Sequence, residues 1–327
     1  MFNLIGFKKQ NEIILNNYIS NNLHSSVLIY GPKGIGKRTF INKFINDLLI
    51  KIFDENSYLH HLNLFKNNTH PNIKILEKVT DQKTKKLKSH ITIDQIRQTK
   101  KFLNESSSVK KIKKILIIDS ADDLNINAAN SFLKILEEPK KNTLIFLISH
   151  QISSLIPTIR SRCLKIKFNK HEFVDFKEIL SNKALNLNDE EIKFYYDLTF
   201  GSPGDAITLF NSNIIDCFDT TIQSMCLKSF SKENTDLASI LSKFNNDEFK
   251  LYISLLKSIL VFLNKLKNND INKNVYLSNK FELLKNYSNS VTKKNIIDRF
   301  NYLSKNENDL FTYNLDKKMF ILKFLNI

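Results

Sequence analysis

The chain has 327 residues, of which 42% are hydrophobic, and it carries a formal net charge of +16 at pH 7. This length fits two or three domains, and no apolar run approaches the roughly 18 residues that span a membrane. The three scattered cysteines suggest neither a disulfide framework nor a metal site, and the N-terminus lacks the pattern of a signal peptide, so we expect a cytoplasmic protein.

The basic charge has two explanations. It would attract an acidic partner, and nucleic acid is the first candidate. It also follows from a composition rich in Asn, Ile and Lys on a solvated surface. Composition alone leaves both explanations open.

The first informative stretch is a glycine-rich turn that follows a predicted helix at residues 8–21. An apolar run at 27–30 predicts a buried strand, and residues 40–49 predict an amphipathic helix. Between them, Gly-Pro-Lys-Gly-Ile-Gly-Lys at 31–37 has the spacing of a phosphate-binding P-loop. Glycines let loop N–H groups approach a polyphosphate, and Lys37 would reach the outer phosphates. We therefore favour a nucleotide site over an unliganded turn.

One position departs from the motif. Arg38 stands where a P-loop has the Ser or Thr hydroxyl that holds Mg²⁺, and the nearest hydroxyl, on Thr39, comes one residue late. The sequence therefore predicts a phosphate cradle with a defective metal site.

The next segment, residues 54–72, is polar and contains three histidines, His60, His61 and His70. Adjacent histidines on a helix point about 100° apart, which is a poor start for a metal site. We expect these to be surface or loop histidines. Short strands are then predicted at 72–76 and 90–93.

Asp94 is predicted to cap a helix, and residues 115–118 form a buried strand that ends in Asp119. An acidic residue there, downstream of a P-loop, would hold Mg²⁺ through water, as in a Walker B motif. Hydrolytic proteins place Glu next, whereas this chain has Ser120. Because a serine needs its own activator to act as a base, we expect no hydrolysis at this site.

The rest of the chain has two parts, one with alternating helices and strands and one that is helical. A helix is predicted at 125–138, and strands at 144–148 and 164–168. Past residue 169 the periodicity becomes helical to the end of the chain. Ser202-Pro203 marks a helix start there.

Three motifs lie downstream of the P-loop: Asp-Ser-Ala-Asp-Asp-Leu-Asn at 119–125, Ala-Ala-Asn-Ser-Phe-Leu-Lys-Ile-Leu-Glu-Glu-Pro at 128–139 and Pro-Thr-Ile-Arg-Ser-Arg-Cys at 157–163. Together they resemble the AAA+ clamp-loader ATPases, and most closely the delta-prime subunits of bacterial DNA polymerase III. The resemblance continues in Gly-Ser-Pro-Gly-Asp-Ala at 201–206 and, weakly, in 314–318.

The resemblance implies an α/β fold of three parts. Residues 1–168 would form a P-loop AAA+ domain with a parallel sheet, 169–210 a small helical lid, and 211–327 an all-α collar that oligomerises. The implied assembly is a ring of five that loads a sliding clamp onto primed DNA. Its other members would be gamma/tau motor subunits, which hydrolyse ATP, and a delta subunit. We expect no membrane among the partners.

The resemblance also assigns roles to single residues. Arg162 matches the arginine finger that reaches into a neighbour's ATP site, and Cys163 would be a small buried residue. Gly204 stands where active relatives carry a lid arginine. No cysteine precedes Cys163, so the family's zinc module would be absent or free of metal. We expect bound ATP or ADP, a doubtful Mg²⁺ site and no zinc. The expected nucleotide-binding residues are Gly31, Pro32, Lys33, Gly34, Ile35, Gly36, Lys37, Arg38, Thr39 and Asp119.

Two functions remain to be weighed. The first is a clamp-loader subunit of the DNA polymerase holoenzyme that donates Arg162 in trans and is not itself catalytic. The second is a self-sufficient AAA+ ATPase, either a motor subunit or a DNA translocase, in which Thr39 and Asp122 or Asp123 replace the missing groups. Lysines of the α/β domain would contact DNA, although the sequence does not say which.

Overall fold

The computed structural model describes residues 4–80, 88–183, 185, 187–227, 232–268 and 281–326. Its contacts form two compact units, Met1–Asn182 and Lys183–Ile327. The finer division at residues 168 and 210 stays a prediction.

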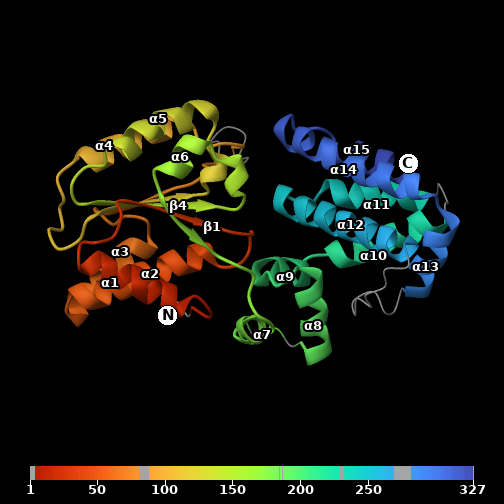
Figure 1. Cartoon of the computed structure of the whole chain (residues 1–327), viewed down its shortest axis with the longest axis horizontal. Helices are drawn as coiled ribbons and strands as arrows, with labels where there is room; N and C mark the ends of the chain where they lie inside the picture. Colours follow the sequence, from red (N-terminus) through yellow and green to blue (C-terminus); the bar gives the residue numbers. More distant parts are fainter. Residues whose placement is uncertain are drawn as a thin grey trace. The chain divides into compact units, whose positions relative to one another are not determined.

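The N-terminal unit is built on a sheet that includes β1 and β4 (Figure 1). The sheet is parallel and has five strands in the order β2-β3-β4-β1-β5. The strands are β1 (Ser26–Tyr30), β2 (Ile73–Leu76), β3 (Lys114–Asp119), β4 (Thr143–Ser149) and β5 (Leu164–Lys167). Strands β3 and β4 are almost wholly buried, as expected of parallel strands covered on both faces. The predicted α/β fold with a parallel sheet is confirmed.

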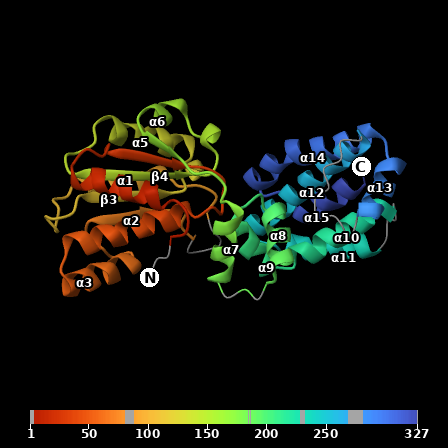
Figure 2. The same ribbon diagram turned by 60° about the horizontal axis from the view of Figure 1, so that its bottom comes forward.

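Helices cover both faces of this sheet, because alternate strand residues point to opposite sides. Ile29 and Phe146 pack with α1 (Lys8–Ile19), α2 (Lys37–Ile52) and α3 (Glu55–Lys66). Leu28 and Leu147 pack with the opposite layer. That layer is formed by α4 (Ile93–Asn104), α5 (Ile126–Glu137) and α6 (Pro157–Ser161). Helices α2 and α3 thus lie across the sheet from α5 and α6 (Figures 1 and 2).

The carboxyl ends of three strands converge at one edge of the sheet. Tyr30 at the end of β1 is in register with Ser149, and Asp119 at the end of β3 is in register with Ile148. Since β4 lies between β1 and β3, the turn after β1 and the Asp119 carboxylate share this edge. This is the edge at which open α/β sheets bind ligands. Helix α7 (Phe173–Ser181) follows β5 and completes the unit.

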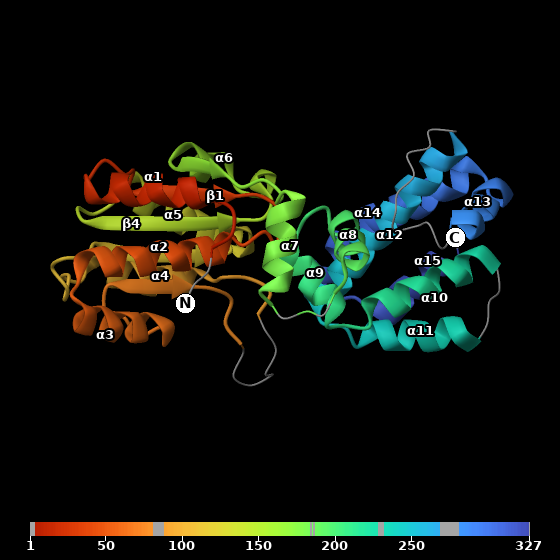
Figure 3. The same cartoon turned by 90° about the horizontal axis from the view of Figure 1, so that it is seen from below.

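The C-terminal unit is helical throughout its described residues. Its helices are α8 (Asp189–Leu198), α9 (Pro203–Phe210), α10 (Ile214–Leu227), α11 (Lys232–Ser242), α12 (Asn246–Lys267), α13 (Phe281–Ser290), α14 (Lys293–Thr312) and α15 (Lys317–Leu325). Helix α12 starts at a capping box made by Asn245 and Glu248, and its apolar face packs against α13 and α14. Helices α10 and α11 lie side by side (Figure 3). None of the described helices is both long and apolar enough to span a bilayer.

Two local predictions are wrong. Residues 90–93 form only an isolated bridge, Ile91 with Leu124, because α4 begins at Ile93. Thr92 caps that helix through a capping box with Gln95, so Asp94 lies in the first turn and is not the cap. The polar segment after residue 54 contains α3, whose Leu62 and Phe65 face the core.

Candidate functional site

The glycine-rich loop joins the end of β1 to the start of α2 at the carboxyl edge of the sheet. The Gly31 N–H donates to the Ser149 carbonyl oxygen at 3.2 Å, and a Cβ on Gly31 would lie 2.1 Å from the Phe168 carbonyl oxygen. Only glycine therefore fits at the end of β1. Gly36, with φ of 90°, is the N-cap of α2 and offers no side chain to its first-turn N–H groups. A helix N-terminus behind such a loop is suited to a phosphate.

The other predicted loop residues divide between solvent and core. Pro32, Lys33 and Thr39 are exposed, whereas Ile35 packs into the core and 1% of its surface is exposed. Gly34 has φ of 77°, which favours glycine. Ile35 thus anchors the loop in the core of the unit.

Lys37 is buried against the loop. Its Nζ donates to the carbonyl oxygens of Gly31 at 2.6 Å and Pro32 at 2.5 Å, and 3% of the residue is exposed. These contacts fix the ammonium against the backbone at the start of the loop.

Arg38 makes the contact that the sequence did not predict. Its Nη1 lies 3.0 Å from Oδ2 of Asp119, and its Nε donates to Oδ1 of Asn42 at 3.2 Å. Asn42 is one helical turn after Arg38, so the i, i+4 spacing was a signal for this second contact. The guanidinium is held between α2 and the end of β3.

These residues do not fit a Mg²⁺ ion. The expected hydroxyl ligand is replaced by a cation, and the expected carboxylate is already neutralised by that cation. Thr39, one residue later and so about 100° around the helix, is exposed. The backbone geometry expected of a phosphate cradle is therefore present, whereas one expected metal ligand is replaced by Arg38 and the other, Asp119, is paired with it.

The two carboxylates after Ser120 are also engaged elsewhere. Asp122 accepts hydrogen bonds from the Ser149 hydroxyl at 2.8 Å and the Ser154 hydroxyl at 2.6 Å. It also accepts from the His150 N–H at 2.5 Å and from the Ser120 hydroxyl at 3.1 Å. It thereby ties the end of β3 to the end of β4.

Asp123 forms an ion pair of 3.1 Å with Lys78. Neither this carboxylate nor that of Asp122 is placed as an unengaged base for an attacking water.

Arg162 is the C-cap residue of α6. Its Nη2 lies 2.8 Å from Oε1 of Glu137, and its Nη1 donates to the Thr158 carbonyl oxygen at 3.0 Å. The Arg162 side chain is 35% exposed, so the guanidinium remains accessible from one side. Glu137 was not predicted as its partner, although it lies in the Leu-Glu-Glu-Pro motif at 136–139.

Cys163 is buried, and burial raises the pKa of its thiol to about 11. A thiol of that pKa is not a nucleophile at neutral pH, which agrees with the predicted packing role. Gly204 lies in the first turn of α9 and carries no side chain with which to sense a phosphate.

The histidines form a pair of which one member is buried. His61 Nδ1 lies 3.1 Å from His70 Nε2, and the Asn72 N–H donates to His70 Nδ1 at 3.1 Å. His60 is exposed, as expected. His70 lies in the loop before β2, which the prediction of surface or loop histidines allows, but it is buried there, at 4% exposed. Within the described ranges, no group of three or more His, Cys, Asp and Glu side chains could hold a metal.

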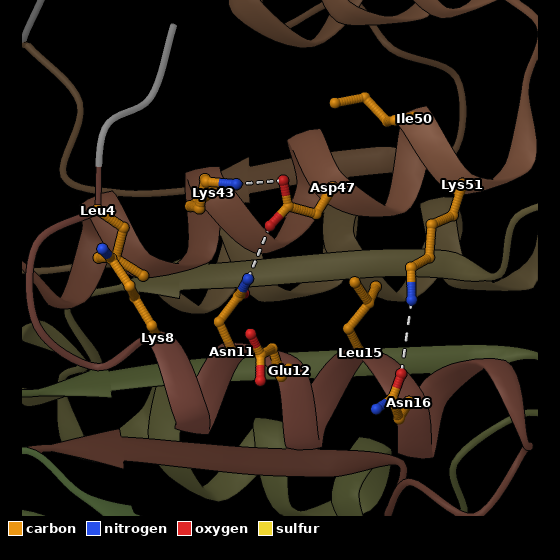
Figure 4. A pocket seen from close by; sticks show the side chains of 10 residues that line it. All are labelled: Leu4, Lys8, Asn11, Glu12, Leu15, Asn16, Lys43, Asp47, Ile50 and Lys51. Carbon is orange, nitrogen blue, oxygen red and sulfur yellow. Dashed lines mark hydrogen bonds and ion pairs between the residues drawn. The ribbon is translucent and has the colours of Figure 1, made fainter.

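A groove of about 630 Å³ lies between α1 and α2 (Figure 4). Asn11 donates to Asp47 at 2.7 Å across it, and Lys43 pairs with the same carboxylate. None of the predicted nucleotide-binding residues lines the groove. The convergence of strand ends and the P-loop backbone place the candidate site at the sheet edge instead.

Comparison with known families decides the relationship. The sequence model of the family described as "DNA polymerase III, delta subunit" matches residues 7–172, just over half of the chain. The chain belongs to this family. The range shared with the DNA polymerase III delta family includes the P-loop, Asp119 and Arg162, and residues 173–327 lie outside it.

Two curated relatives are named DNA polymerase III subunit delta′. The chain is 36% identical to the DNA polymerase III subunit delta′ of Pseudomonas aeruginosa over 42% of this chain and 41% of that protein. That match therefore spans less than half of the relative's length. The chain is also 24% identical to the Escherichia coli subunit delta′ over 76% of this chain and 72% of that protein. The predicted resemblance is confirmed.

A solved structure is similar over nearly all of the chain. It is a DNA polymerase III gamma subunit-related protein from Thermotoga maritima, with 17% identity and a TM-score of 0.43, covering 98% of this chain and 97% of that chain.

Proposed function

We propose that this chain is the delta-prime subunit of a bacterial clamp loader, working in the cytoplasm. It helps to load a sliding clamp onto primed DNA without hydrolysing ATP, and it donates Arg162 to a neighbouring motor subunit. The observation that carries the proposal is Arg162, a partly exposed guanidinium that follows α6 within the range shared with the family.

The chemistry expected of Arg162 is electrostatic. A guanidinium that enters a neighbour's ATP site stabilises the charge that develops on the transferring phosphoryl group. Such a finger contributes ~10³–10⁵ in rate, or roughly 4–7 kcal/mol of barrier. The Glu137 contact is an accessible ion pair, and a neighbour's phosphate can displace the carboxylate at small cost.

The partners follow from this role. They are gamma/tau motor subunits and a delta subunit, with the clamp and the primed DNA bound by the whole complex. An ATP or ADP held in the chain's own P-loop would serve structure rather than turnover. Contacts of lysines with DNA phosphates would weaken steeply with salt. Equal affinity of the assembled loader for primed DNA at low and high salt would remove that role.

The decisive experiment measures clamp- and primer-stimulated ATP turnover by the reconstituted loader. Arg162→Ala should lower turnover by about 10³-fold or more while the complex still assembles. Lys165→Ala, which removes an exposed cation on the adjacent β5, is the matched control and should leave turnover unchanged. Unchanged turnover with Arg162→Ala would contradict the proposal.

The alternative, a self-sufficient ATPase, needs Thr39 and one of the carboxylates after Ser120 to act at the P-loop. The exposed Thr39, the satisfied Asp122 and the Lys78–Asp123 pair all count against it. Steady ATP turnover by the purified chain, abolished by Asp119→Ala, would support this alternative.

A further inference from the structure

The Arg38–Asp119 ion pair lies at the position where a P-loop protein places its divalent cation. The pair joins the first turn of α2 to the carboxyl end of β3, which are 81 positions apart in the sequence. Asn42 holds Nε of the same guanidinium at 3.2 Å, so that, among contacts between described residues, Nη2 and the second hydrogen of Nη1 remain as further donors.

Arg38 is suited to this place because its charge is permanent and its donors form a rigid fork. A guanidinium matches the geometry of phosphate oxygens and stays ionised throughout the physiological pH range. The side chains of Arg38 and Asp119 are 30% and 23% exposed, so the pair is reached from the solvent side of the loop.

A divalent ion would meet two obstacles here. It would have to take the Asp119 carboxylate from Arg38, and it would then lie beside an uncompensated guanidinium. Like charges a few ångströms apart in a partly dry site repel strongly. In an ordinary P-loop, phosphate binding and metal binding are coupled. In this loop the Arg38–Asp119 pair disfavours the metal, so phosphate binding would not depend on it.

We propose that Arg38 replaces the metal ion, so that this P-loop binds the polyphosphate chain of a nucleoside di- or triphosphate without a divalent cation. The loop N–H groups and Lys37 hold one part of the chain, and Arg38 donates to the phosphate oxygens that Mg²⁺ would otherwise bridge. Asp119 orients the guanidinium. This inference goes beyond the clamp-loading role and does not depend on it, because it is measured on the isolated full chain.

The test is calorimetric titration of the full chain with ADP, in excess EDTA and in excess Mg²⁺. The wild-type affinity should be equal in the two conditions, or weaker with Mg²⁺ because the ion competes for the ligand. Arg38→Thr restores the hydroxyl of an ordinary P-loop. It should weaken binding in EDTA by about tenfold or more, the effect of losing charge-assisted hydrogen bonds, and should gain affinity when Mg²⁺ is added.

Three further measurements control for nonspecific anion binding, for the role of the nucleoside and for misfolding. Lys37→Ala should abolish binding in both conditions, which distinguishes the loop from adventitious anion binding. Inorganic tripolyphosphate in place of ADP shows whether the phosphate chain alone is the ligand, and it should follow the same dependence on Arg38. Thermal unfolding of Arg38→Thr shows that the variant is folded.

Two results would overturn the inference. One is wild-type binding that is about tenfold tighter with Mg²⁺ than with EDTA, which would show that a metal enters despite Arg38. The other is the absence of ADP and tripolyphosphate binding in both conditions, which would show that the contacts of Lys37 and Arg38 close the loop.

Discussion

Arg162 and Glu137 form an ion pair in which Nη2 lies 2.8 Å from Oε1. The two side chains are 35% and 45% exposed, so the pair is one that solvent screens. If Arg162 acts in a neighbour's site, its contact with Glu137 competes with that role in the unassembled chain.

Removing this competition should favour assembly slightly. A partly exposed ion pair contributes about 0.5–1 kcal/mol, so Glu137→Gln should lower the chain concentration that gives half-maximal loader turnover by about two- to fivefold. The maximal turnover should stay the same. The measurement is a titration of the variant into the remaining subunits.

Glu138→Gln is the matched control, since it removes an adjacent exposed carboxylate that forms no ion pair with the residues that the structure describes. It should leave the titration unchanged. A higher half-maximal concentration for Glu137→Gln would mean instead that Glu137 positions Arg162 in the assembled site.

Asp122 should prove structural. Asp122→Ala leaves the hydroxyls of Ser149 and Ser154 and the His150 N–H without the carboxylate that they share. Hydrogen bonds to a charged group contribute about 1.5–3 kcal/mol. Loss of the whole network in Asp122→Ala should therefore lower the free energy of unfolding by about 2–4 kcal/mol. Urea unfolding followed by circular dichroism measures the change.

Asp123→Ala is the comparison for this network. It removes one partly exposed ion pair with Lys78 and should cost about 1 kcal/mol or less. If the two variants lost the same free energy of unfolding, the hydrogen bonds of Asp122 between β3 and β4 would not contribute more than one exposed ion pair.

Much of the site was predictable because it is formed by residues that are consecutive in the sequence. The strand, glycine turn and helix around Gly31–Gly36 follow one another in the chain, so apolar runs and glycine spacing were enough to place them. The sheet strands at 114–119 and 143–149 were predictable for the same reason, as short buried apolar runs.

The contacts between distant residues were not predictable. Arg38 was recognised as a departure from the motif, but its pairing with Asp119 depends on β1 and β3 flanking β4, which the sequence pattern does not state. Likewise, His70 is buried because the chain after α3 packs it into the unit, and its polar neighbours in the sequence did not indicate this. The missed cap at Thr92 is different, because its capping box with Gln95 was visible in the sequence.

His70 makes stability depend on pH. Burial lowers its pKa to about 4, with smaller contributions from the positive charges of His61, His60 and Lys114. The folded chain therefore keeps His70 neutral, whereas in the unfolded chain it titrates near its ordinary value of about 6.5. The stabilisation that comes from keeping His70 neutral is present in full above about pH 6.5. As the pH falls toward 4 it is lost, and the free energy of unfolding is about 2–3 kcal/mol lower at pH 4.5.

The matching variant is His70→Asn, whose side-chain oxygen can still accept the Asn72 N–H but cannot be protonated in this range. The difference in unfolding free energy between pH 7.5 and pH 4.5, from urea titrations, should be smaller by about 2–3 kcal/mol in His70→Asn than in wild type. His60→Gln removes an exposed histidine and should change that difference little. An unaltered pH dependence in His70→Asn would show that the imidazole of His70 is solvated and titrates as it does in the unfolded chain.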